Sequence, residues 1–79
     1  MIEGMELLTR MDVDVLMAFA KCDMRVCKAS RDTFYHRNTF EWHLARIRSK
    51  TGLNPKKFYD LVKLVNAVEE MERNGVTPR

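Results

Sequence analysis

The sequence predicts an all-α fold, a small bundle of about four helices that residues 1–79 form as a single domain. Three observations lead to this prediction. Apolar residues recur at helical spacing, helix start and stop signals bound the segments that contain them, and no segment alternates convincingly with the period of two typical of a strand. A chain of 79 residues can also build only one hydrophobic core. We therefore expect consecutive helices joined by short turns.

The first long helix is predicted over residues 10–22. Thr9, followed three residues later by Asp12, forms a capping-box pattern at its start. Apolar residues then follow at helical spacing, namely Val13, Leu16, Met17 and Ala20. Two interpretations stay open for residues 1–9, an N-terminal arm that frays or a short extra helix, because Gly4 interrupts their apolar pattern.

Two helices joined by a short connection are predicted in the middle of the chain. After a polar break, a segment from Val26 to about Asp32 can hold two helical turns, and residues 33–35 supply the connection. The next helix starts near His36 and ends before Gly52, which stands where a left-handed C-cap is expected. The residues that face the core on this helix are Phe40, Leu44 and Ile47.

The last helix is predicted from Pro55 to Arg73, followed by a C-terminal tail over residues 74–79. Asn54 is a suitable N-cap residue, and a proline at the first helical position loses no hydrogen bond. The apolar residues of this helix cover much of its circumference: Phe58, Leu61, Val62, Leu64, Val65, Val68 and Met71. Either one side covers the bundle while the other meets a second copy of the chain, or all of them close over a single core.

A short helix, a turn of about three residues and a longer helix form the helix-turn-helix pattern, in which the second helix lies in the DNA major groove. With Phe40, Leu44 and Ile47 facing inward, the outward positions are Asn38, Trp42, Ala45, Arg46 and Ser49, with Arg37 and Thr39 at the exposed N-terminal end. The indole of Trp42 has two open interpretations, a DNA-facing side chain or one tucked against the first helix.

The charge distribution agrees with a surface that binds a polyanion. Residues 21–57 contain ten Lys or Arg and three acids, a net charge of +7, whereas residues 1–20 carry −3 and residues 58–79 carry −1. Each contact with a phosphate needs a nearby cation, so a basic middle between acidic ends favours nucleic acid as a partner.

Four stretches of the sequence form a recognisable pattern: His36-Arg37-Asn38-Thr39-Phe40, Leu44 with Arg46-Ile47, Thr51-Gly52-Leu53-Asn54, and Phe58-Tyr59-Asp60-Leu61. With this pattern the chain resembles, over roughly residues 12–72, the C-terminal helix-turn-helix domain of PucR-type bacterial transcriptional regulators. That family is related to the DNA-binding end of the factor for inversion stimulation, so the resemblance implies a homeodomain-like or Fis-like bundle.

The resemblance also implies that the start of the recognition helix reads DNA, here through Arg37, Asn38, Thr39 and Trp42. The chain departs from the family pattern at Ser30 and Thr33, where a small Ala and an apolar Leu are usual, and at Glu41 and Trp42. A carboxylate at position 41 opposes phosphates unless it contacts a cytosine amino group or pairs with a neighbouring cation. The large sensory region of the family is outside this sequence, so we expect no small-molecule ligand.

Several other classes of protein are disfavoured. The longest apolar run, residues 15–20, is too short to span a membrane, so we expect a cytoplasmic protein without membrane contact. Cys22 and Cys27 are interpreted as reduced thiols. If they joined His36 and His43 around zinc, the two histidines would lie about 10 Å apart, too far for one ion. No catalytic set or phosphate loop is apparent, and we expect no enzyme, no cofactor and no metal.

The sequence thus predicts a sequence-specific DNA-binding protein, a transcriptional regulator that acts as a homodimer. The residues assigned to DNA binding are His36, Arg37, Asn38, Thr39, Trp42, Arg46 and Lys28. The residues assigned to the dimer interface are Phe58, Leu61, Val62, Leu64, Val65 and Val68. The alternative is a protein-interaction module that keeps the helix-turn-helix fold without binding DNA.

Overall fold

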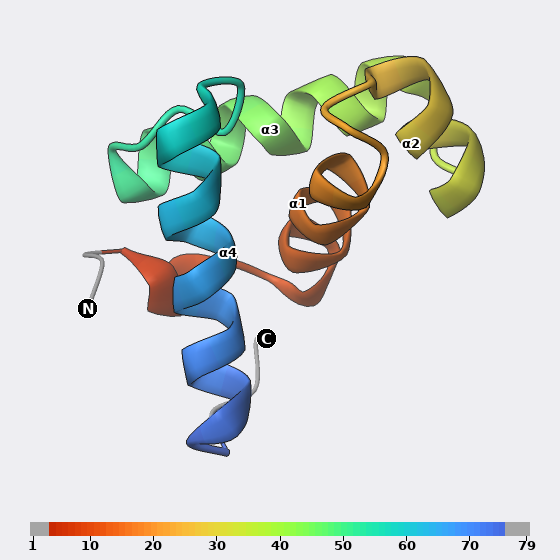
Figure 1. Ribbon diagram of the computed structural model, residues 1–79. Coiled ribbons are helices and arrows are strands. Elements are labelled where there is room, and N and C mark those ends of the chain that lie inside the picture. Colours follow the sequence, from red (N-terminus) through yellow and green to blue (C-terminus); the bar gives the residue numbers. More distant parts are fainter. Residues whose placement is uncertain (1–3, 76–79) are drawn as a thin grey trace.

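The structure, a computed structural model, describes residues 4–75, and in this range it consists of four α-helices and one short 3₁₀ helix (Figure 1). The elements are η1 (Met5–Leu7), α1 (Arg10–Lys21), α2 (Val26–Thr33), α3 (Arg37–Thr51) and α4 (Phe58–Arg73). The predicted all-α bundle is confirmed, since these residues form no strand. None of the described helices is long and apolar enough to cross a membrane.

Helix α1 is the central element, and each of the other three α-helices packs against it. Figure 1 shows α3 lying across the top of α1, α2 beside the start of α3, and α4 running away from the far end of α3. Val15, Leu16 and Phe19 of α1 are at most 2% exposed, and the ring of Phe19 lies 6.3 Å from that of Phe40 on α3. The face of α3 that carries Phe40 is therefore turned toward α1.

The N-terminal residues form a short helix rather than a frayed arm, as far as they are described. Met5 and Leu8 are each 1% exposed and belong to the core. Gly4 permits this docking, since it has a φ of +87° and a Cβ there would lie 1.9 Å from the carbonyl oxygen of Lys50. Residues 1–3 of the predicted arm and residues 76–79 of the predicted tail lie outside the described range.

The connection between α2 and α3 lies one residue later than predicted, because Thr33 still belongs to α2 and α3 begins at Arg37. Its hydroxyl donates to the carbonyl of Ala29 at 2.9 Å, and that of Ser30 donates to the carbonyl of Cys27 at 3.1 Å. At these two departures from the family pattern, each hydroxyl group thus donates to a backbone carbonyl one turn earlier in the helix. Phe34 then ends α2 with a φ of +61°, a left-handed conformation that is costly for a residue with a side chain.

Helix α4 starts at Phe58, three residues later than predicted from Pro55. Gly52 caps α3 in the predicted left-handed conformation, with a φ of 76°. Asn54, however, uses its side-chain oxygen to accept from the Lys56 N–H at 3.0 Å, while its carbonyl accepts from the Lys57 N–H at 2.9 Å. These two bonds close a separate turn over residues 54–57, so the proline belongs to that turn and not to the helix.

A buried carboxylate joins the start of α1 to the middle of α3. Asp12 is 0% exposed, and its Oδ2 accepts from the Thr9 N–H at 2.9 Å, which completes the predicted capping box. The same Oδ2 accepts from Nε of Arg46 at 2.9 Å, and Oδ1 lies 2.6 Å from Nδ1 of the buried His43. All the hydrogen-bonding partners that hold this carboxylate therefore come from two elements that must be packed together.

The hydrogen bonds to Asp12 lower its pKa. Burial acts in the opposite direction and raises the pKa, but the bonds from the Thr9 backbone, His43 and Arg46 together outweigh it. The ionised carboxylate is thus the form that the folded state favours.

Burial of the inward face of α3 predicts a large difference between two neighbouring substitutions. Leu44 is 2% exposed, so Leu44→Ala should lower the free energy of unfolding by about 2–5 kcal/mol. Trp42 is 60% exposed, so Trp42→Ala should cost less than about 1 kcal/mol. Urea titrations followed by circular dichroism measure both values. If the Trp42 variant is the one that unfolds, the helical phase described for α3 is incorrect.

The Asp12 cluster predicts a stability that depends on acid pH. Because the folded-state pKa of Asp12 lies below that of the unfolded chain, its contribution is complete above about pH 4 and is lost as the pH falls through the folded pKa. Asp12→Asn should cost about 3 kcal/mol at pH 7, and this cost should shrink below pH 4. Asp14→Asn is the control, since Asp14 is exposed and should contribute little. A cost for Asp12→Asn that is independent of pH would contradict the assignment.

Candidate nucleic-acid interface

Helices α2 and α3 and the short turn between them form a helix-turn-helix unit that rests on α1. Phe40, Leu44 and Ile47 are at most 2% exposed, which confirms that they form the inward face of α3. The opposite side of α3 lies along the top of the molecule in Figure 1, and its residues Asn38, Trp42, Ala45 and Ser49 are exposed. The unit therefore presents the start and one whole side of its second helix to solvent.

The N-terminus of α3 has the arrangement predicted from the sequence. His36 is the N-cap, and its Nδ1 accepts from the Asn38 N–H at 3.1 Å. The imidazole thus acts as a helix cap. Arg37, Asn38 and Thr39 follow, and all three side chains are exposed. This end of α3 combines the positive end of the helix dipole with a guanidinium group and two short hydrogen-bonding side chains.

The outward side of α3 carries four exposed residues at helical spacing that have no charge. They are Asn38, Trp42, Ala45 and Ser49. The indole of Trp42 is 60% exposed and is not tucked against α1. The indole and the ring of His43 form a T-shaped pair, with centroids 4.9 Å apart and planes at 85°. Since His43 is itself bonded to Asp12, the exposed indole stands on a buried support.

Two of the charged residues on α3 are engaged by other elements. Oε2 of Glu41 accepts from Nζ of Lys56 at 2.8 Å, so the carboxylate that opposes phosphates has a paired cation. Lys56 comes from the turn before α4, fifteen residues away in sequence, and nothing in the sequence indicated this pairing. Both side chains are about half exposed, and such a pair contributes little to stability.

Arg46 corrects a prediction, because it does not point outward. Its guanidinium turns back to Asp12 and also donates to the carbonyl oxygen of Leu7 at 3.2 Å. The side chain is 27% exposed. The reason is electrostatic: a buried carboxylate one layer below offers a stronger partner than water. Arg46 thus holds α1 and η1 against α3.

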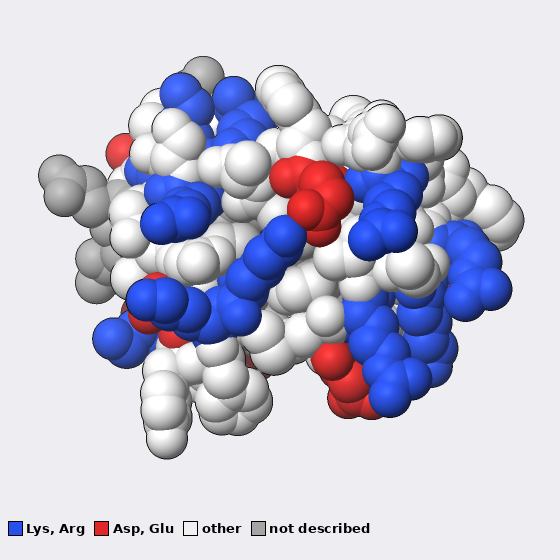
Figure 2. All heavy atoms as spheres, turned by 90° about the horizontal axis from the view of Figure 1, so that it is seen from above, with Lys and Arg blue, Asp and Glu red and all other residues white. Residues whose placement is uncertain are grey.

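The remaining cations of the basic middle are on the surface. Figure 2 looks down on the face that contains α2, α3 and the turn before α4, and Lys and Arg side chains are spread across it with few acids among them. The exposed Lys and Arg between residues 21 and 57 are Lys21, Arg25, Lys28, Arg31, Arg37, Arg48, Lys50, Lys56 and Lys57. The predicted basic segment is therefore also a basic surface.

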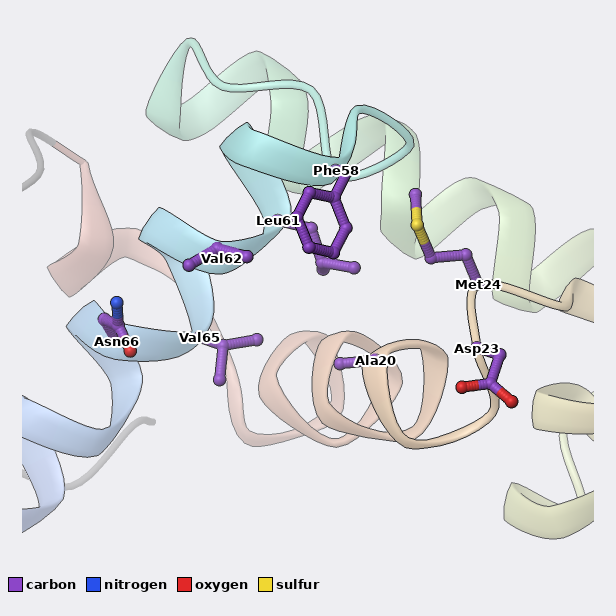
Figure 3. A pocket seen from close by; sticks show the side chains of 8 residues that line it. All are labelled: Ala20, Asp23, Met24, Phe58, Leu61, Val62, Val65 and Asn66. Atoms are coloured by element: carbon purple, nitrogen blue, oxygen red, sulfur yellow. The ribbon is translucent and has the colours of Figure 1, made fainter.

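An apolar groove of about 400 Å³ lies on another part of the molecule, between α4 and the end of α1. Figure 3 shows Phe58, Val62 and Val65 of α4 on one side of it and Ala20 and Met24 on the other. Phe58 is 63% exposed and Val62 is 40% exposed. The sequence predicts such exposed apolar side chains, because apolar residues cover much of the circumference of this helix.

Three residues assigned to a dimer interface are not available for one. Leu61, Leu64 and Val68 are 4%, 0% and 2% exposed, and they fill the core beneath α4. The helix meets its own bundle with these residues because α4 crosses α1 on that side. Of the predicted set, Phe58, Val62 and the partly buried Val65 remain at the surface.

The two thiols have different surroundings. Cys22 is buried, and its Sγ donates to Oδ2 of Asp32 at 3.3 Å, whereas Cys27 is exposed. Burial raises the pKa of the Cys22 thiol, and the neighbouring carboxylate of Asp32 raises it further. In the described part of the chain no three His, Cys, Asp or Glu side chains are grouped as metal ligands.

Comparison with known proteins agrees with this geometry. Residues 12–69 match the family described as the PucR C-terminal helix-turn-helix domain. Neither the curated proteins nor the solved structures contain a significant match. The family match spans most of α1, the helix-turn-helix unit and most of α4, and it covers well over half of the chain. The chain therefore belongs to the family of PucR C-terminal helix-turn-helix domains.

Proposed function

We propose that this protein is a sequence-specific DNA-binding transcriptional regulator whose helix α3 enters the major groove. The observation that carries the proposal is the outward side of α3, which offers uncharged hydrogen-bonding and aromatic side chains on a face that is rich in cations. Bases are read by side chains of that kind, and phosphates on either side of the groove are bound by Lys and Arg.

The residues fall into two groups by the contacts they suit. Arg37, Asn38, Thr39 and Trp42 lie in the first two turns of α3, from which recognition helices reach base edges. Lys28 on α2 is exposed and suits a phosphate. The carboxylate of Glu41 repels DNA phosphates less than an unpaired carboxylate would, because it is paired with Lys56. The role of Arg46 is the structural one described above.

The DNA contacts predict two kinds of weakened binding. Arg37→Ala should weaken binding to a preferred duplex by about 1–3 kcal/mol, the usual range for a lost base contact. Lys28→Ala should weaken binding to all duplexes alike and reduce the slope of log K against log salt by about one unit. Fluorescence anisotropy with labelled duplexes at several salt concentrations measures both effects.

Lys63→Ala is the matched control for charge, since Lys63 is an exposed cation on α4. It should leave affinity and salt slope nearly unchanged. If the unaltered protein binds no duplex at low salt and is not retained on heparin, the DNA-binding proposal fails. The alternative function, an interaction module for another protein, would then gain support from the apolar groove.

We also propose that two copies associate through α4, since one helix-turn-helix unit reads few base pairs and two-fold dimers read two half-sites. The groove and the protruding Phe58 beside it are suited to each other in an antiparallel pairing of two α4 helices. The charges suit the same pairing: Lys57 precedes the helix, and Glu69 and Glu70 lie near its end. Each basic start would then meet an acidic end.

This interface predicts different outcomes for two charges placed on α4. Val62→Glu should convert a dimer to a monomer that stays folded, whereas Leu64→Glu should unfold the bundle, because Leu64 is 0% exposed. Met11→Glu is the control, a 43% exposed apolar residue outside the groove, and it should remain dimeric. Sedimentation velocity at micromolar concentration gives the states. A monomeric unaltered protein throughout that range would exclude the interface.

A further inference from the structure

Trp42 is the one bulky side chain among the uncharged residues of the outward side of α3. One turn before it lies Asn38, and towards the C-terminus lie Ala45 and Ser49, which are small. The side chain of Trp42 is 60% exposed, and burial of its large apolar ring against a bound molecule would be favourable. Its position therefore points to an apolar group on the bound molecule.

The indole is also held in place before any partner arrives. It forms a T-shaped pair with the ring of His43, which is 6% exposed and lies with its Nδ1 2.6 Å from the carboxylate of Asp12. The ring of Tyr35 stacks on the same imidazole, with centroids 6.3 Å apart. A side chain supported in this way loses less conformational freedom on binding than a mobile one.

Only one base offers an apolar group in the major groove. Thymine carries its C5 methyl there, whereas adenine, guanine and cytosine present only hydrogen-bond donors and acceptors. The neighbouring Asn38 carries the amide that pairs with adenine through N6 and N7, and no Lys or Arg, the residues that most often read guanine, occupies the middle of this strip.

We propose that Trp42 is a specificity-determining residue that packs against the C5 methyl group of a thymine, so that this part of the recognition site is an A·T pair. The inference rests on the proposed DNA binding by α3 and adds the identity of the base. Removal of one buried methyl group changes a binding constant about fourfold.

The test uses the full chain and duplexes that it selects from a random-sequence pool. In the selected duplex, each thymine is replaced singly by deoxyuridine, which removes the C5 methyl and keeps the base pairing. At one thymine position per half-site, the unaltered protein should bind about fourfold more weakly to the uridine duplex. Trp42→Ala should bind more weakly overall and should no longer distinguish thymine from uridine at that position.

Two further variants make the result specific. Trp42→Phe keeps an apolar ring and should retain part of the discrimination between thymine and uridine. If the alanine variant is unstable, Trp42→Gln takes its place, because glutamine also removes the apolar ring and favours a helix. Tyr59→Ala, which removes a 79% exposed aromatic ring from α4, should keep the full ratio. Circular dichroism of each variant reports its folding.

The outcomes separate the two proposals. The role of Trp42 is overturned, and DNA binding is not, if the protein selects and binds a duplex but removal of no thymine methyl changes the affinity. The same holds if Trp42→Ala keeps the ratio of affinities for the thymine and uridine duplexes that the unaltered protein shows. Failure to bind or select any duplex overturns both. A methyl effect that disappears with Trp42→Ala and persists with Tyr59→Ala supports the assignment.

Discussion

The carboxylate of Asp12 is the interaction on which the arrangement of this domain depends. It is fully buried, and it is stable there as an anion because the Thr9 N–H, the Arg46 guanidinium and the His43 ring surround it. One partner belongs to the start of α1, and the other two belong to α3. A buried charge without these partners would be strongly unfavourable, so the packing of α1 against α3 and the ionisation of Asp12 are mutually dependent. Arg46 extends the cluster to η1 by its bond to Leu7.

This cluster connects the core to the surface that we propose for DNA binding. His43 is bonded to the carboxylate of Asp12 and forms a T-shaped pair with Trp42, so a single residue links the buried anion to an exposed side chain. Helix α3 is thereby fixed in rotation about its own axis, with Phe40, Leu44 and Ile47 inward. Which side chains of α3 can meet a base is decided by that rotation, since a small turn of the helix would replace Trp42 at the surface by a neighbour.

Much of the fold could be predicted because its signals are local. The Thr9 and Asp12 capping box, the helix start near His36, the left-handed Gly52 and the spacing of Phe40, Leu44 and Ile47 each depend on residues within a few positions of one another. The observed start of α4 differs from the predicted one for a local reason too, since Asn54 and Pro55 suit a helix start and an isolated turn equally well. On the surface, the exposed Arg37, Asn38, Thr39 and Trp42 followed from the same helical phase.

The sequence by itself determined the class of fold, the family, the helical segments and the basic middle of the chain, because periodicity, capping and composition depend only on residues close together in the sequence. Only the tertiary structure decided which polar residues became partners. The helical pattern predicts an outward Arg46, but the fold places Asp12 within hydrogen-bonding distance of it. Glu41 pairs with Lys56, which comes from the turn before α4. Leu64 is buried because α4 packs with that side against the bundle. Each of these contacts joins residues from different elements, and their distances depend on how the helices pack, which no local pattern in the chain specifies.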